Sequence, residues 1–332
     1  MKAYQSAVDG MRHPQLFKIQ TNLTMLSFKA MKIVPAYYII TQALARGELL
    51  PGATIVETSS GNFGVGMAMV CNMLGHPFVI IGDPAIDDSY RQQLTMLGGK
   101  VEIITDKKGS QGYQKARLDR VQEILGTESG SFWCRQYDNP DNAKAYEKAG
   151  ISLLDQIGTE LILVAAVGSG GSSCGLAHAI RSTGANCTLV GVDTFNSILF
   201  GQMDGPRRLR GLGNTVMPKN LCHNLFDYVH WVSSELADYQ TRKLYSTTGH
   251  FRGPTTGAAY LVASYLATEN PQKQVVFVSP DDGSRYATST YAESLVDKSS
   301  KPIRPLEFAC PRENNIGIDW AFMNWNRRNI ME

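Results

Sequence analysis

Short β-rich apolar runs alternate with longer segments of helical periodicity along most of this chain, from about residue 34 onward. The runs that we expect to be strands cover residues 53–57, 77–81, 101–104, 161–167, 188–193 and 274–278. The helical segments cover residues 65–74, 87–97, 113–125, 175–181, 235–247 and 257–268. This alternation is typical of parallel sheets whose faces are covered by helices. The sequence therefore predicts the α/β class, with mostly parallel, twisted sheets.

The repeats form two series that meet near residues 140–160, which predicts two α/β domains. With 332 residues, of which 43% are hydrophobic, the chain is long enough to bury two cores. The last 32 residues carry two tryptophans, so we expect this tail to dock on a surface. The expected division is a smaller N-terminal domain over 35–145, a larger domain over 1–34 and 146–300, and a C-terminal tail over 301–332.

The charge pattern argues against a polyanionic partner. The chain carries 32 basic and 30 acidic residues, a net charge of +2, without a long run of either sign. We therefore expect a small-molecule partner, and neither nucleic acid nor a membrane surface. No stretch approaches the roughly 20 apolar residues that cross a bilayer, and charged and polar residues occur throughout residues 1–20, so we expect a soluble, cytoplasmic protein.

Six cysteines are scattered along the chain without a C-x-x-C pair or a histidine at metal-ligand spacing: Cys71, Cys134, Cys174, Cys187, Cys222 and Cys310. We expect reduced, mostly buried thiols and no metal site. A catalytic cysteine would need a histidine brought close by the fold.

A glycine-rich loop at residues 168–175, Gly-Ser-Gly-Gly-Ser-Ser-Cys-Gly, lies between a predicted buried strand and a predicted helix. Glycines let backbone N–H groups converge, hydroxyls add donors, and the helix N-terminus favours negative charge, so a phosphate is the expected ligand. The alternative is a tight turn without a ligand. The loop lacks the P-loop lysine, and Ser173 stands at the third glycine of G-x-G-x-x-G. Asp193 nevertheless ends the next strand where a dinucleotide fold places its ribose-binding acid, which keeps an NAD(P)-dependent dehydrogenase as an alternative.

A second loop, Glu-Thr-Ser-Ser-Gly-Asn-Phe-Gly at residues 57–64, also joins a strand to a helix. Its hydroxyls, carboxamide and free N–H groups could bind a carboxylate. An ordinary capped turn is the alternative.

Taken in order, these loops and four further segments resemble motifs of one enzyme family. The matching segments are residues 51–64, 136–142, 168–175, 211–213, 253–257 and 280–286. They are similar to the substrate loop P-G-x-T-I-V-E-P-T-S-G-N-T-G, to Q-F-x-N-P-x-N, to the phosphate loop G-T-G-G-T-x-x-G, and to G-I-G, G-x-S-S-G and P-D-S-G-x-R-Y. The family is that of cysteine synthase and cystathionine β-synthase, pyridoxal 5'-phosphate enzymes of fold type II with the fold of the tryptophan synthase β subunit. The resemblance covers about residues 16 to 295.

The resemblance implies an active site between the two domains and a role for each matching residue. It implies that Lys29 is the Schiff-base lysine and that Asn62 binds the ring oxygen of the cofactor. The phosphate would be bound by Gly168, Ser169, Gly170, Gly171 and Ser172, and Asp282 would face the pyridine nitrogen. The substrate carboxylate would be bound by Ser59, Ser60, Gly61 and Gln136.

The implied reaction is β-replacement on a serine-type amino acid, such as O-acetylserine or O-phosphoserine, through an aminoacrylate intermediate. The nucleophile would be sulfide or another small nucleophile, and the protein a homodimer. Around Lys29, however, the family's Asn, Pro, Gly and Asp are missing. A paralogue that binds pyridoxal phosphate with weak or no catalysis is therefore a further alternative.

Two substitutions modify these expectations. Phe63 replaces a threonine of the substrate loop, which predicts a bulkier and less polar pocket edge. Asp282 stands where many relatives have a serine, although Asp281 could take the same place. A carboxylate there would favour a protonated ring nitrogen and hence a stronger electron sink.

Overall fold

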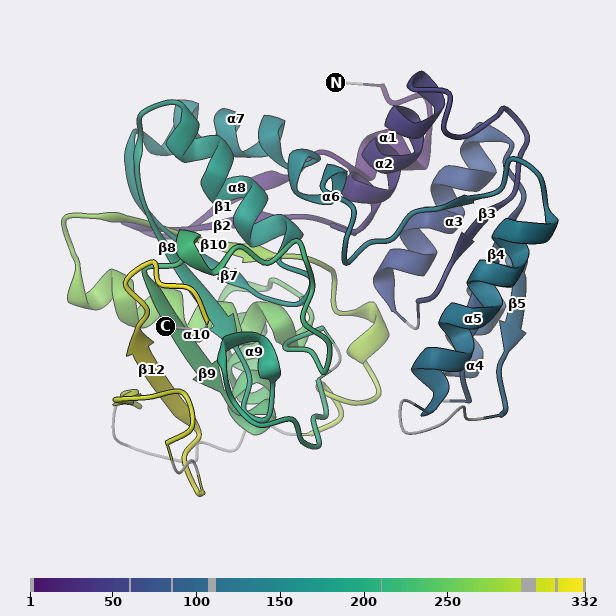
Figure 1. Cartoon of the computed structure of the whole chain (residues 1–332). Coiled ribbons are helices and arrows are strands. Elements are labelled where there is room, and N and C mark those ends of the chain that lie inside the picture. Colours follow the sequence, from purple (N-terminus) through teal and green to yellow (C-terminus); the bar gives the residue numbers. More distant parts are fainter. Residues whose placement is uncertain are drawn as a thin grey trace. The chain divides into compact units, whose positions relative to one another are not determined.

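The computed structural model describes residues 3–59, 61–84, 86–106, 112–209, 211–293, 303–313 and 316–330. The chain forms two compact units (Figure 1). Unit 1 comprises Met1–Arg12 and Ala30–Ala145, and unit 2 comprises His13–Lys29 and Tyr146–Glu332.

Unit 2 contains an eight-stranded sheet with the order β1-β2-β10-β7-β8-β9-β12-β11. The five central strands, β2, β10, β7, β8 and β9, are parallel, whereas β1 and β12 run antiparallel to their neighbours β2 and β9. The strands are β1 (Gln15–Gln20), β2 (Leu23–Ser27), β7 (Glu160–Ala166), β8 (Asn186–Asp193), β9 (Tyr228–Val232), β10 (Gln274–Ser279), β11 (Leu306–Glu307) and β12 (Trp320–Asn324).

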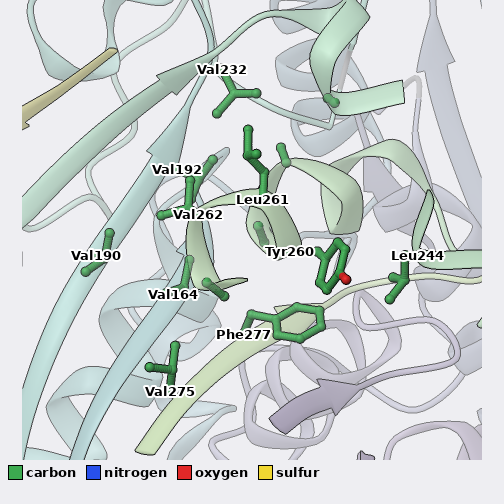
Figure 2. Packing of buried hydrophobic residues seen from close by; sticks show 14 of the residues in the cluster. Val164, Val190, Val192, Val232, Leu244, Tyr260, Leu261, Val262, Val275 and Phe277 are labelled. Atoms are coloured by element: carbon green, nitrogen blue, oxygen red, sulfur yellow. The ribbon is translucent and has the colours of Figure 1, made fainter. Parts of the chain in front are cut away.

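Four helices cover this sheet: α7 (Glu147–Ile157), α8 (Gly171–Ser182), α9 (Ser234–Thr248) and α10 (Pro254–Glu269). Helices α7 and α8 lie on one face, and α9 and α10 lie on the other (Figure 1). Apolar side chains of β7, β8 and β10 pack against Tyr260, Leu261 and Val262 of α10 (Figure 2). Because β7, β8 and β10 are covered on both faces, they are mostly apolar, as the sequence runs predicted.

Unit 1 contains a parallel four-stranded sheet with the order β5-β4-β3-β6. Ile55 and Ile80 pack into one apolar cluster with α2, α3 and α4, while Val56 and Val79 pack with α5 on the opposite face. This alternation along each strand places a core on both sides of the sheet. The elements are β3 (Ile55–Glu57), β4 (Phe78–Gly82), β5 (Lys100–Ile103), β6 (Phe132–Trp133), α1 (Ala7–Met11), α2 (Ile33–Ala45), α3 (Asn62–Leu74), α4 (Asp88–Met96), α5 (Gly112–Thr127) and α6 (Asp141–Lys144).

The boundaries of the units differ from the expected division in two respects. Residues 1–12 and 30–34 belong to unit 1, because Val8 of α1 and Ile33 of α2 are buried in its apolar cluster. The described part of the tail is not merely docked on a surface. Strand β12 pairs with β9 inside the sheet of unit 2, and Trp320 and Trp325 are buried.

Candidate active site

Four parallel strands of unit 2, β2, β10, β7 and β8, end at the same edge of its sheet. From β7 the chain passes through α8 to β8 on one side, whereas β10 lies on the other side of β7. Such a reversal of strand order is a topological switch point, where α/β sheets bind ligands beyond the carboxyl ends of their strands. The predicted phosphate loop begins two residues after β7, at this switch point.

The phosphate loop turns directly from β7 into the first turn of α8. Gly170 precedes the helix with a left-handed backbone, φ +79°, and a Cβ there would lie 2.6 Å from Leu221 Cα. A side chain at this position would collide with backbone, so glycine is required. The Gly170 carbonyl oxygen accepts bonds from the Cys174 N–H and the Ser173 Oγ at 2.9 and 3.1 Å. The N–H groups of the first turn, which have no partner inside the helix, remain for an anion.

Two other predicted segments lie against this loop. The Gly213 N–H donates to the Val167 carbonyl oxygen at 3.0 Å, and a Cβ on Gly168 would lie 3.6 Å from the Gly211 oxygen. A Cβ on Gly211 would in turn lie 2.9 Å from Thr255 Oγ1, at the start of α10. The structure therefore brings together three of the segments on which the family resemblance was based.

Asp193, the candidate ribose-binding acid, has a structural role. Its side chain is fully buried, and its Oδ1 accepts the Thr194 N–H at 2.8 Å. A Cβ added to Gly213 would lie 2.9 Å from the same oxygen. Burial raises its pKa to about 7. A side chain without exposed surface cannot bind a ribose, so the premise of the dehydrogenase alternative was wrong.

Both aspartates after β10 make local hydrogen bonds. Asp281 is buried and its Oδ2 accepts the Tyr286 hydroxyl at 3.1 Å. Asp282 is partly exposed and its Oδ1 accepts the Ser284 N–H at 2.9 Å. Two residues upstream of Asp281, Ser279 pairs through its hydroxyl with Thr256 of α10 at 3.0 Å. The end of β10 is thereby tied to the N-terminus of α10.

Two lysines follow β2, and their surroundings differ. Lys29, the predicted Schiff-base lysine, is exposed at the end of a unit 2 segment. Lys32 lies in unit 1 and is the residue that precedes α2. Burial lowers the pKa of Lys32 from 10.5 to about 8. The backbone of Lys32 packs against α3, because a Cβ on Gly66 would lie 2.9 Å from the Lys32 carbonyl carbon.

The same helix, α3, follows the predicted substrate loop. Ser59 is buried, and its Oγ accepts the N–H groups of Gly61 and Gly64 at 3.4 and 3.2 Å. The Tyr90 hydroxyl donates to the Ser59 carbonyl oxygen at 3.1 Å and occupies the space of a Cβ on Gly64. Asn62 is the first residue of α3, one turn before Gly66. Ser60 lies outside the described residues.

Glu57 places Gln136 beside this loop. The Glu57 carboxylate is buried and accepts the N–H of Thr58 at 2.7 Å, the indole N–H of Trp133 at 3.0 Å and the N–H of Gln136 at 3.4 Å. Burial raises the pKa of Glu57 to about 7, although these donors oppose the shift. Arg135, the residue before Gln136, has a φ of +50°, an uncommon backbone conformation of the kind often found at functional sites.

Phe63 does not form the bulkier, less polar pocket edge that the sequence predicted. Its side chain is 2% exposed and belongs to the apolar cluster of unit 1. Phe63 is the second residue of α3 and faces the core. Its aromatic ring, which stands where the family has a threonine, therefore fills apolar volume in the core.

These residues fit pyridoxal phosphate. The cradle at Gly170, at a helix N-terminus, suits a dianionic phosphate. A partly buried lysine with a lowered pKa suits a covalent link to an aldehyde, since only the neutral amine reacts. Sequence reasoning named Lys29 and did not consider Lys32, which stands three residues further on. The difference in their solvent exposure is not visible in the sequence.

A family model described as pyridoxal-phosphate dependent enzyme matches residues 10–281. The chain belongs to this family. An N-(2-amino-2-carboxyethyl)-L-glutamate synthase from Ralstonia nicotianae is 35% identical over 264 residues, 77% of each chain. A synthase with the same name from Cupriavidus metallidurans is 30% identical over 266 residues, 78% of each chain. The cysteine synthase of Entamoeba histolytica has the same fold, with a TM-score of 0.80 and 22% identity over 88% of this chain and 92% of that one.

These findings confirm the predicted fold type II architecture, the cofactor pyridoxal 5'-phosphate and an enzyme of the cysteine synthase type that performs β-replacement. The individual residue roles stay predictions.

Proposed function

We propose that this protein joins the β-carbon of a serine-type amino acid to an amine, with Lys32 as the lysine that holds the cofactor. The product named for the two relatives is L-glutamate whose nitrogen carries a 2-amino-2-carboxyethyl group. That group is the three-carbon skeleton of serine, attached through its β-carbon. An amino acid such as L-glutamate is therefore the nucleophile we propose, in place of sulfide.

The amine nucleophile rests on the names of the two relatives, and the observation that carries the choice of lysine is the environment of Lys32. With its pKa lowered from 10.5 to about 8 by burial, about a tenth of Lys32 is neutral at pH 7, roughly 300-fold more than an unperturbed lysine. A neutral amine is needed to hold an aldehyde and, once displaced, to take the α-proton of the substrate. Lys29, in contrast, is exposed to solvent.

The remaining residues would bind the cofactor and orient it. Bound pyridoxal phosphate supplies an electron sink that stabilises negative charge at the α-carbon of an amino acid. Its phosphate would lie on the N–H groups of the loop from Gly168 to Ser172, and Asn62 would bind its ring oxygen. Asp282 is our proposal for the group that faces the ring nitrogen, with Asp281 as the alternative.

The substrate carboxylate would be bound by unit 1. Ser59, Gly61 and Gln136 lie around one loop that Tyr90 and Glu57 hold in place. Ser60 would share this role. A loop fixed before the substrate arrives loses little conformational freedom on binding.

A product assay tests the proposal. The protein, loaded with pyridoxal phosphate, is mixed with O-acetylserine or O-phosphoserine and with L-glutamate or sulfide, and the products are weighed by mass spectrometry. We expect the glutamate adduct with at least one donor and a much slower formation of cysteine. Cysteine as the main product would overturn the amine nucleophile but leave β-replacement standing. A lack of product with every pair would favour the paralogue without catalysis.

We also propose a cytoplasmic homodimer, which rests on the family resemblance. Within the described ranges, no helix is both long and apolar enough to span a bilayer. Sedimentation of the purified protein would test the dimer.

A further inference from the structure

Two cysteines that the proposed reaction does not use lie in contact next to the phosphate loop, one in α8 and one just before the turn His223–Leu225. Cys174 is buried in the first turns of α8, and Cys222 is exposed at the start of the turn His223–Leu225. The Cys222 N–H donates to Cys174 Sγ at 3.3 Å, and the Cys174 thiol donates to the Cys222 carbonyl oxygen at 3.9 Å. The pair is 48 residues apart in sequence, so the fold alone brings it together.

Both cysteines are linked to the loop itself. The Cys174 N–H donates to the Gly170 carbonyl oxygen at 2.9 Å. Leu221, the neighbour of Cys222, packs so closely that its Cα would lie 2.6 Å from a Cβ on Gly170. A change in the covalent state of the pair would therefore reach Gly170 by two routes, through the hydrogen bond from Cys174 and through the contact with Leu221.

The two sulfurs differ in their chemistry. The hydrogen bond from Cys174, together with the field of His178, lowers the pKa of Cys222 to about 6. The pKa of Cys174 is raised by its hydrogen bond with Cys222 and by burial. The exposed sulfur thus has the lower pKa and the buried sulfur the higher one, which is the arrangement of an attacking cysteine and a resolving cysteine.

We infer that Cys222 and Cys174 form a redox-active pair that hydroperoxides convert to a disulfide. The Cys222 thiolate attacks one oxygen of the hydroperoxide, the O–O bond breaks, and a sulfenic acid and hydroxide (or alkoxide) result. The Cys174 sulfur then attacks the Cys222 sulfur and displaces its oxygen as water, with the Cys174 proton. Two thiols lose two electrons and two protons in total, and the peroxide is reduced.

The disulfide would lower the affinity of the phosphate loop for the cofactor phosphate. An S–S bond of about 2.05 Å is much shorter than a thiol hydrogen bond, so oxidation draws the segment around Cys222 toward α8. Leu221 already contacts Gly170 and leaves no room for this movement. We expect the affinity for pyridoxal phosphate to fall by about tenfold on oxidation and to return on reduction.

Peptide mapping after treatment with hydrogen peroxide tests the pair. In the full-length protein we expect a peptide that links Cys222 to Cys174 and that disappears with dithiothreitol. Cys174→Ser should stop at a sulfenic acid on Cys222 that dimedone labels, and Cys222→Ser should form no link. Cys310→Ser, at another exposed cysteine, is the matched control and should behave like the wild type.

Each result has a clear meaning. Faster or equal oxidation of Cys310, or the absence of the linked peptide, would overturn the redox pair. A disulfide without a change in the affinity for pyridoxal phosphate would overturn the link to the phosphate loop. Neither measurement uses turnover, so failure of the proposed reaction would not be mistaken for failure of this inference.

Discussion

The two glycine-containing loops are built in different ways. The phosphate loop of unit 2 is shaped by backbone: Gly170 touches Leu221 and accepts bonds from the first turn of α8. The substrate loop of unit 1 is shaped by side chains, with the Ser59 hydroxyl, Tyr90 and Glu57 as its supports. In the phosphate loop, one added Cβ at Gly170 is enough to cause a collision with backbone. In the substrate loop, each supporting side chain can be removed separately, and one of them, Glu57, titrates.

The backbone cradle should give the largest effect. Gly170→Ala forces a Cβ against Leu221 and places alanine at a φ of +79°. We expect the affinity for pyridoxal phosphate to fall by roughly 100-fold, the equivalent of about 2.7 kcal/mol, measured by absorbance titration. Gly184→Ala is the matched control, because Gly184 has a φ of +87° with no atom near its Cβ position. Equal losses in the two variants would show that strain, and not the contact, is responsible.

The pH response of the substrate loop should come next in size. The folded pKa of Glu57 is about 7 against 4.5 for an ordinary glutamate, so Glu57 contributes stability below pH 4.5 that is lost as the pH rises through 7. Between pH 5 and 7 this loss amounts to about 2 kcal/mol at most. Denaturant titration of Glu57→Gln should show a flatter dependence of the free energy of unfolding on pH between about pH 5 and 7, inside the interval spanned by the two pKa values. Asp193 adds a parallel response, since its pKa is also about 7, and an unchanged slope in the variant would assign the whole response to Asp193 or to other groups.

The smallest effect should follow from one hydroxyl. Tyr90→Phe removes the donor to the Ser59 carbonyl oxygen, a loss of about 1 to 2 kcal/mol. We expect KM for the amino-acid donor to rise by about tenfold while the affinity for pyridoxal phosphate stays unchanged. Tyr228→Phe, at an exposed tyrosine, is the control. A similar loss of cofactor affinity would mean that Tyr90 supports the whole unit and not the loop.

Sequence patterns predicted β3, β4, β5, β7, β8 and β10, most of which read as apolar runs. They did not predict β1, β2, β6, β9, β11 and β12, several of which are very short or lie at the edge of a sheet, where one face or one side is open. They also predicted the phosphate loop, since glycine, hydroxyl and helix start follow one another directly in the chain. They could not assign Phe63 or Asp193, whose surroundings are made by distant residues. The choice between Lys29 and Lys32 likewise depended on burial, and the contact between Cys174 and Cys222 on the tertiary fold.

The most direct test of this account is to reduce the protein with borohydride after loading it with pyridoxal phosphate and to map the modified peptide. The account predicts the cofactor on Lys32, a Lys32→Ala variant that cannot be labelled, and a Lys29→Ala variant that is labelled as the wild type is. Label on Lys29, abolished by Lys29→Ala and retained by Lys32→Ala, would contradict it.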